Sequence, residues 1–256
     1  MAHPKYEGQV VVPTGGYSLT LTLSGLPVVC TLAAGTYYLG TLLTALAAAI
    51  STATAATWTV VCDDDANAST GRITISTAGS PGLTLVTWTS TALRDLLGYT
   101  GSETITGGNS VQGAGHSRYL WLPDVGRGPA LAPDGTAGIL ESDGVMSLAP
   151  SGNIKVLAYN IRRRDVITHE YLSGRKVWST YVTYANEALE RFYTDVIGLG
   201  VPFRYFPARE TDATYVGYVP DAEAIASMGV AAMDPAWTSS AYAQWGWRCP
   251  VREKVA

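Results

Sequence analysis

An apolar stripe at helical spacing, followed by short alternating runs, most constrains how this chain can fold. Over residues 38–51 the stripe repeats at i, i+3, i+4, i+7 and i+11 and consists of Leu39, Leu42, Leu43, Leu46 and Ile50. Such a stripe predicts an amphipathic helix with one buried face. The runs Trp58–Cys62 and Arg72–Thr77 come next, are rich in β-branched residues and flank a polar turn. They predict a hairpin beside the helix. This pattern says more about how the chain folds than about any reaction it could perform.

Alternating runs predict further strands along both halves of the chain. Tyr17, Leu19, Leu21 and Leu23 alternate with Ser and Thr, which is the period of a half-buried strand. The other strands are predicted over 27–32, 83–88, 118–122, 153–171 with a break near 162–165, 202–207, 214–219 and 243–251. A short helix is predicted from Thr91 to a stop at Gly98. The Pro- and Gly-rich segment 123–153 is expected to form a long structured loop with a short strand near 136–140.

A second amphipathic helix is predicted over 186–197, with Asn186 as its cap. Its stripe consists of Leu189, Phe192, Tyr193, Val196 and Ile197. The segment 106–116 is made largely of Gly, Ser and polar residues and is typical of a linker. We therefore expect an α+β, strand-dominated fold of two β-rich, sandwich- or barrel-like domains, each with one main helix. The predicted domains are 1–105 with helix 38–51 and 117–256 with helix 186–197, joined by the linker 106–116.

Charge and cysteine content exclude several classes of protein. Only 15% of the residues are charged and the net charge is −4, without a basic tail, so a nucleic-acid partner is not expected. Residues 1–115 carry three basic and six acidic groups, whereas residues 151–256 carry twelve and eleven, which supports a boundary between the halves. Cys30, Cys62 and Cys249 have unrelated spacings and predict buried free thiols made in a reducing cytoplasm. Neither a signal sequence nor an apolar run of membrane-spanning length is recognisable, so no membrane partner is expected.

The candidate chemical sites do not assemble into a catalytic pattern. Asp63, Asp64 and Asp65, with Asn67, are contiguous rather than alternating and lack a distal Glu, so they favour a polar turn over a calcium loop. His3, His116 and His169 are not at zinc-ligand spacing, and His169 has no nucleophile motif to serve. Glu187, Glu190 and Asp195 fall on the polar face of the second helix. No catalytic residue, metal or cofactor is therefore predicted, and the chain is not expected to be an enzyme.

Two groups of residues are instead candidates for an interface. The most concentrated group of charges is Arg162, Arg163 and Arg164. Arginine is frequent at protein interfaces, so a contact between subunits is favoured over the alternative, a contact with DNA. The aromatic residues near the C-terminus are Trp237, Tyr242, Trp245 and Trp247. They can anchor an interface, stack on a sugar or pack in a core. Trp237, Trp245 and Trp247, with the three arginines, are the predicted interface residues.

Several phrases resemble structural proteins of tailed bacteriophage particles. In the first half these are Gly35-Thr-Tyr-Tyr-Leu-Gly-Thr-Leu-Leu-Thr-Ala-Leu, Gly71-Arg-Ile-Thr-Ile-Ser and Leu93-Arg-Asp-Leu-Leu-Gly-Tyr-Thr-Gly. In the second half, the phrase Tyr171-Leu-Ser-Gly-Arg-Lys-Val-Trp, the helix 186–197 and the phrase Gly200-Val-Pro-Phe-Arg-Tyr-Phe-Pro are similar to tail components. The resemblance covers about two thirds of the chain.

The resemblance implies a non-enzymatic virion protein, made in the cytoplasm of a bacterial host. It implies assembly with itself into a symmetric ring and contact with other virion structural proteins, with the distal tail or baseplate as the expected place. One alternative is a carbohydrate- or receptor-binding module that uses the aromatic C-terminal residues on a host-surface glycan. A second alternative is a head-associated or neck protein.

Overall fold

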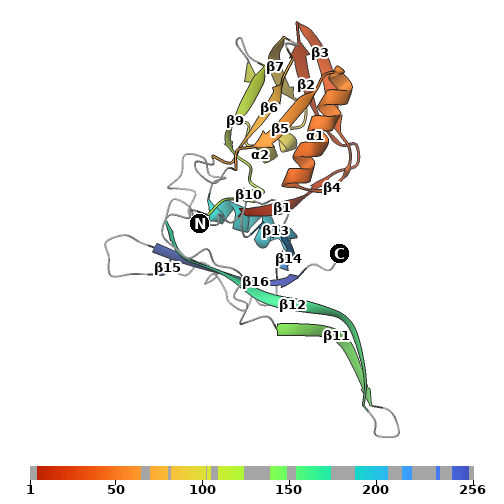
Figure 1. Ribbon diagram of the computed structural model, residues 1–256, viewed down its shortest axis with the longest axis vertical. Helices are drawn as coiled ribbons and strands as arrows, with labels where there is room; N and C mark the ends of the chain where they lie inside the picture. Colours follow the sequence, from red (N-terminus) through yellow and green to blue (C-terminus); the bar gives the residue numbers. More distant parts are fainter. Residues whose placement is uncertain are drawn as a thin grey trace.

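The chain folds into a strand-dominated α+β structure. The computed structural model describes residues 5–64, 70–79, 82–101, 103–104, 109–123, 139–148, 154–173, 188–206, 215–220, 235–236 and 244–253. Within these ranges the strands form three antiparallel sheets, none of which closes into a barrel. Figure 1 shows a strand-rich body at one end, a long sheet beneath it and a two-stranded arm that leaves the sheet. The expected fold class is confirmed.

Two small sheets and the helices α1 (Leu39–Thr54) and α2 (Thr91–Leu97) make up the body. The first sheet has the order β3-β2-β7-β8 and the second has the order β5-β6-β9. Their strands are β2 (Tyr17–Leu23), β3 (Leu26–Leu32), β7 (Leu83–Trp88), β8 (Glu103–Thr104), β5 (Trp58–Cys62), β6 (Arg72–Thr77) and β9 (Ser110–His116). The predicted hairpin is confirmed, because β5 pairs with β6 from Trp58 opposite Thr77 to Cys62 opposite Ile73.

Helix α1 (Leu39–Thr54) closes the body along β3 and β5, the outer strands of the two sheets. All five residues of the predicted stripe are buried, which confirms the helix and places its apolar face on the sheets. The helix begins one residue later and ends three residues later than predicted. Ala55 stops it in a left-handed conformation, with φ of 52°.

The predicted linker 106–116 is wrong over its second part. Ser110–His116 is strand β9, which pairs with β6, while residues 105–108 lie outside the described ranges. The Gly and Ser residues that suggested a loop instead allow close approach of two backbones. The Gly115 amide donates to the Gly98 carbonyl at 2.8 Å, and a Cβ on Gly98 would lie 2.5 Å from the Gly115 carbonyl oxygen. Gly98 also ends helix α2 (Thr91–Leu97) with φ of 79°, as predicted.

The third sheet has nine strands and runs beneath the body. Its order is β10-β1-β13-β14-β16-β12-β11, with β4 paired to β1 and β15 paired to β16. The strands are β1 (Lys5–Val12), β4 (Gly35–Tyr38), β10 (Leu120–Trp121), β11 (Ile139–Leu148), β12 (Ile154–Ser173), β13 (Phe203–Phe206), β14 (Val216–Pro220), β15 (Pro235–Ala236) and β16 (Gln244–Glu253). Strand β1 joins this sheet to the body, since its first half pairs with β13 and its second half with β4.

The second helix packs on one face of this sheet. Of the predicted 186–197, the described part is α4 (Leu189–Phe192) continued by a π-helical turn, η3 (Tyr193–Ile197). The described helix begins after Ala188, and Asn186, the predicted cap, lies outside the described residues. Leu189, Phe192, Val196 and Ile197 are buried as predicted, and Tyr193 is partly buried against them.

Two predictions for the middle of the chain are wrong. Part of the expected long loop is strand β11, and β12 continues through 162–165 without the expected break. The two strands pair from Ile139 opposite Arg164 to Leu148 opposite Ile154, with one register shift after Ser142. Polar residues such as Glu141 and Asp143 interrupt the apolar alternation by which a strand is recognised in the sequence. The strand forms through backbone hydrogen bonds to an antiparallel partner, which composition alone does not reveal. No described helix is both long and apolar enough to cross a bilayer.

Candidate functional site

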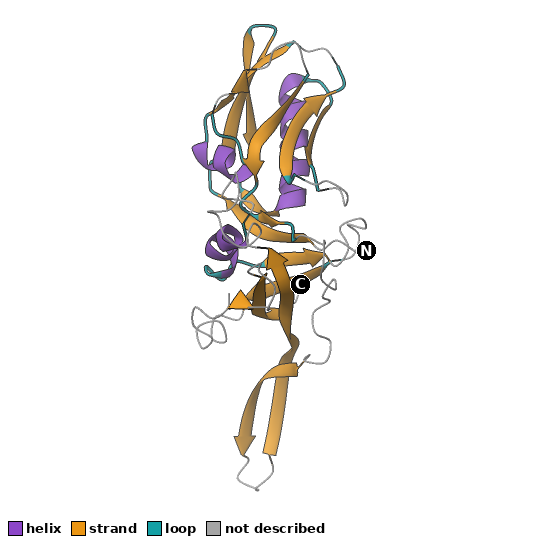
Figure 2. Cartoon of the chain, turned by 90° about the vertical axis from the view of Figure 1, so that its left-hand side faces the viewer, coloured by secondary structure: helices purple, strands orange, loops and turns teal. Residues whose placement is uncertain are grey.

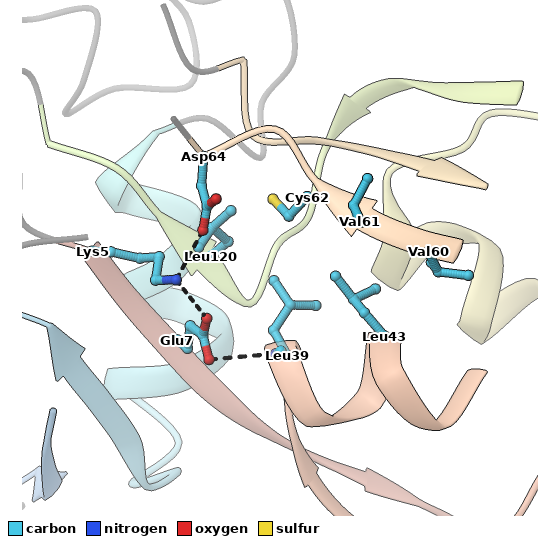
Figure 3. A pocket seen from close by; sticks show the side chains of 10 residues that line it. Lys5, Glu7, Leu39, Leu43, Val60, Val61, Cys62, Asp64 and Leu120 are labelled. Atoms are coloured by element: carbon cyan, nitrogen blue, oxygen red, sulfur yellow. Dashed lines mark hydrogen bonds and ion pairs between the residues drawn. The ribbon is translucent and has the colours of Figure 1, made fainter. Parts of the chain in front are cut away.

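A pocket lies where the body meets the nine-stranded sheet. Its volume is about 210 Å³, and β1, β5, β10 and the first turn of α1 surround it. Figure 3 shows a polar end formed by Lys5, Glu7 and Asp64. The rest of the lining comes mainly from Leu39, Gly40, Leu43, Val60, Val61, Cys62 and Leu120.

The polar end is a buried ion cluster. The Lys5 Nζ lies 3.2 Å from Glu7 Oε1 and 2.8 Å from Asp64 Oδ2. The Lys5 and Glu7 side chains are only 3% and 6% exposed, whereas Asp64 is 26% exposed. The ammonium also lies 4.4 Å from the centre of the Phe206 ring. Burial of a lone charge is costly, so each of these groups depends on the others.

Local sequence explains why these charges meet. Lys5 and Glu7 are two residues apart on β1, so their side chains leave the same face of the strand. Glu7 reaches the start of α1, where its Oε2 accepts a hydrogen bond from the Gly40 amide at 3.4 Å. A carboxylate at this end of a helix is favourable, because the first amides lack partners within the helix. Thr41 completes the helix start by accepting from the Tyr38 amide at 3.0 Å.

The pocket contains a thiol but no activated nucleophile. Cys62 lies beside the ion cluster, and burial, followed by the charge of Asp64, raises the pKa of its thiol well above 9.0. A raised pKa keeps the thiol protonated and weakly reactive at neutral pH. Within the described ranges no group of His, Cys, Asp and Glu side chains is arranged to hold a metal ion. The pocket and its ion cluster therefore form an internal joint between β1, α1 and β5.

A second contact ties the sheet to the start of α1. The Arg204 guanidinium on β13 lies 4.0 Å from the centre of the Tyr38 ring and 4.1 Å from that of Tyr215. Arginine stacks well between aromatic faces because its charge is spread over a flat group. Tyr38 is the residue that precedes α1, so this stack fixes the helix start against the sheet.

The predicted acidic turn is divided between two roles. Asp63 Oδ2 accepts from the amide and hydroxyl of Thr70, at 3.2 and 2.6 Å, which closes the turn. Asp64 binds Lys5, while Asp65 and Asn67 lie outside the described residues. His116 is buried, with Nδ1 2.9 Å from the Ser117 carbonyl, and His169 is opposite Trp247 in the sheet. His3 and Glu187 lie outside the described residues, whereas Glu190 and Asp195 lie on the second helix.

Five of the six predicted interface residues lie on two neighbouring strands of the nine-stranded sheet. Arg162, Arg163 and Arg164 are on β12, at one end of the ladder that β12 shares with β16. Trp245 and Trp247 are on β16 towards the other end, where Trp245 is opposite Leu172. Arg164 and Leu172 are eight residues apart, which corresponds to about 26 Å along a strand. Trp237 lies outside the described residues.

Strands β11 and β12 form an arm that extends beyond the sheet (Figure 2). β16 pairs with β12 from Arg164 to Ser173, so the segment 154–163 has β11 as its partner and no third strand among the described residues. Ten residues of strand extend for about 33 Å. By register, Met146 opposite Val156 and Leu148 opposite Ile154 share one face of the arm.

Comparison with known proteins adds no assignment to these features. No family model, curated protein or solved structure matches this chain.

Sequence reasoning missed the ion cluster and the Arg204 stack. The signal for the first was Lys5 and Glu7, two opposite charges on one face of the first strand. No comparable signal existed for Asp64, which is 59 residues from Lys5, or for the Tyr38 and Tyr215 rings around Arg204. These partners are brought together only by the fold.

Proposed function

We propose that this chain is a non-enzymatic structural protein of a tailed-phage particle and that it assembles with itself into a symmetric ring. The place proposed for the ring is the tail, in its distal or baseplate region. This place follows the resemblance of the phrases around Gly35, Leu93 and Gly200 to phage structural modules. The self-assembly rests on the arm.

The arm is the observation that carries this proposal. A two-stranded hairpin without further strands is marginally stable in water, because it lacks a layer against which to bury a face. The outer arm nevertheless places Met146, Leu148, Ile154 and Val156 at register positions of one face. A neighbouring copy in a ring would supply the missing layer at every arm at once. A projecting apolar hairpin is therefore better suited to assembly than to an isolated subunit.

The pocket at the joint supports a structural role. Its charged groups bind one another, with Lys5 between Glu7 and Asp64, and Glu7 also accepts from the first turn of α1. Such an arrangement fixes β1, α1 and the turn after β5 relative to each other. A subunit that transmits contacts around a ring requires this kind of stiff joint between its sheets.

Removal of the outer arm tests the proposal. Residues 143–160 are replaced by Asn-Gly, which suits a two-residue hairpin turn between Ser142 and Ile161, residues that are directly opposite in the ladder. Size-exclusion chromatography with light scattering and negative-stain microscopy are then compared with the full chain. We expect rings of a defined multiple of 27.1 kDa for the full chain and monomers for the shortened one.

Matched point variants separate the apolar face from the arm as a whole. Met146→Glu places a charge at the apolar face, whereas Ser147→Glu places the same charge at the opposite face of the next rung. We expect the first to prevent ring formation and the second to preserve it. A full chain that remains monomeric at high concentration contradicts the proposal, as does a shortened chain that still forms rings.

A further inference from the structure

A long stretch of the body carries no charge. Residues 8–62 contain no Asp, Glu, Lys, Arg or His, and they form β2, β3, β4, α1, β5 and the second half of β1. In an ordinary soluble domain about a quarter of the residues are charged, and most of these face the solvent. Many side chains of this stretch are exposed, so the absence of charge is a property of a surface as well as of a core.

Exposed residues of the stretch meet on β3 and α1, which are neighbours in the body (Figure 1). On β3, Leu26 is 70% exposed and Val29 is 62% exposed. The other exposed residues used below are Thr31 on β3 and Thr41, Thr44 and Ala48 on α1. We call the surface of these six residues the uncharged surface.

A partner can cover the uncharged surface at little cost. The Thr41 hydroxyl donates to the Tyr38 carbonyl at 2.9 Å, and the Thr44 hydroxyl donates to the Gly40 carbonyl at 3.1 Å. Both hydroxyls therefore keep a hydrogen bond when water leaves, and no charge loses its hydration. Burial of exposed Leu and Val side chains is favourable. Depletion of charged residues is also what distinguishes the centre of a protein interface from the remaining surface.

The same lack of charge selects one part of a second copy as the occupant. Residues 144–160, at the outer end of the arm, contain one charged residue, Lys155. Lys155 is opposite Ser147 in the ladder, so its position belongs to the other face from Met146 and Leu148. Over the whole of residues 151–256 there are twelve basic and eleven acidic groups, and burial of such charges without partners is costly.

We propose that the uncharged surface binds the apolar face of the arm of a second copy of this chain. The lengths agree, since the paired residues 143–148 extend for about 20 Å and the sixteen residues of α1 for about 24 Å. The body and the arm lie at opposite ends of the molecule (Figure 1). The contact therefore joins two different surfaces of neighbouring copies, which is the kind of interface that closes into rings. It rests on the ring proposed above and names the surface that receives each arm.

Added charge tests the uncharged surface. Val29→Lys and Ala48→Lys each place an ammonium group there, and lysine is well tolerated at an exposed helix position. Leu199→Lys is the matched control, because Leu199 is 72% exposed and follows the second helix. Assembly is followed by light scattering over a dilution series. We expect the first two variants to raise the concentration needed for assembly by at least about tenfold, and the control to leave it unchanged.

Photo-cross-linking identifies the occupant. A benzophenone amino acid replaces Val29, and the protein is mixed with unmodified chain labelled with heavy nitrogen, so that mass spectrometry separates cross-links between copies from those within one. We expect the main cross-link between copies to reach residues 144–160. The same amino acid in place of Leu199 should not reach that segment. Assembly of the unmodified chain should change little between about 0.05 M and 0.5 M salt, because the contact contains no ion pair.

Several outcomes would overturn the inference. Rings that form equally well with Val29→Lys and Ala48→Lys remove this contact and leave the proposed ring intact, as do cross-links from position 29 to another part of the neighbour. A full chain that never assembles removes both the contact and the ring. If a lysine variant loses its circular-dichroism signal, Leu26→Lys replaces it, and unchanged assembly of that variant also counts against the contact. A steep loss of assembly with salt would indicate an ionic contact instead.

Discussion

The two hydrophobic clusters of this chain differ in composition and in the way they are put together. The body cluster is mostly aliphatic and comes from residues between Val10 and Leu122. The sheet cluster is mostly aromatic and combines Tyr6 and Trp121 with residues between Leu189 and Val251. Its rings lie close together, with centres 4.9 Å apart for Tyr6 and Tyr205 and 5.2 Å apart for Tyr6 and Trp121.

This difference separates a local core from a non-local one. The body cluster draws on residues between Val10 and Leu122, whereas the sheet cluster needs the first strand of the chain to meet residues about two hundred positions away. Non-local pairing is slower to form and costs more chain entropy. Large aromatic side chains bury the most area per residue, which compensates for a cluster built from few, distant pieces. The sheet and its arm therefore depend more than the body does on contacts between residues far apart in the sequence.

Truncation of one buried side chain in each cluster should have the largest effect on stability. Trp121→Ala removes a fully buried side chain of the sheet cluster and should lower the free energy of unfolding by about 3–5 kcal/mol. Leu46→Ala is the matched change in the body, with an expected loss of about 2–5 kcal/mol. Hydrogen exchange should show Trp121→Ala exposing β13 and β14 while β2 and β7 stay protected. Equal loss in both parts would mean that the clusters form one cooperative core.

The joint between the two parts is tested by removing the central cation. Lys5→Met leaves Glu7 and Asp64 without their shared partner, and Glu7 is nearly inaccessible to water. We expect a loss of about 3 kcal/mol in denaturant unfolding. The double variant Lys5→Met/Glu7→Gln should recover most of that loss, because the buried charge is gone. A double variant as unstable as the single one would show that packing, not charge, is responsible.

Alkaline pH should weaken the sheet cluster through its tyrosines. Burial raises the pKa of Tyr205 from 10.0 to about 12, and burial followed by the nearby Tyr205, Cys249 and Tyr218 raises the pKa of Tyr6. The unfolded chain therefore loses these protons at lower pH than the folded chain. Their contribution is complete below about pH 10 and declines as the pH rises through the folded pKa, by about 1.4 kcal/mol per pH unit for each group.

Tyr205→Phe isolates that contribution. It should flatten the fall in the free energy of unfolding between about pH 10 and 12 by roughly 2 kcal/mol, as measured by urea titrations across this range. Tyr215→Phe is the control, since Tyr215 is 45% exposed. An identical pH slope with and without the Tyr205 hydroxyl would contradict the account.

The smallest effect is expected at the Arg204 stack. Arg204→Lys keeps the charge but loses the flat group between Tyr38 and Tyr215, and should cost about 1 kcal/mol. Arg191→Lys, at an exposed position, should change the thermal midpoint by no measurable amount. If the two variants behave alike, the stack does not help to hold the sheet against α1.

Sequence reasoning succeeded where a signal is local. The stripe of α1, the hairpin of β5 and β6, the stop at Gly98 and the buried side of the second helix all follow from spacing over a few residues. It failed at β9 and β11, where Gly, Ser or acidic residues interrupt the apolar alternation of the strand. Strand β9 pairs with β6, from which β7, α2 and β8 separate it in the chain, whereas β11 pairs with the next strand, β12. The bounds and independence of the two predicted domains remain predictions, and strand β1 contributes to both clusters.

The candidate sites show the same limit. The arginine run was visible, but its division between two faces needed the register of β12 against β16. The ion cluster of Lys5, Glu7 and Asp64 needed a contact across 59 residues. Whether Arg162, Arg163, Arg164, Trp237, Trp245 and Trp247 form an interface remains a prediction.

Hydrogen exchange of the arm as a function of protein concentration tests the central claim most directly. In dilute solution, amides of the outer arm, 143–148 and 154–160, should exchange much faster than those of β2 and β7, because the arm then lacks its covering layer. At concentrations where rings form, the arm should become protected while β2 and β7 stay as they were. A monomer whose arm is as well protected as β2 and β7, or an arm whose exchange does not depend on concentration, would contradict the account.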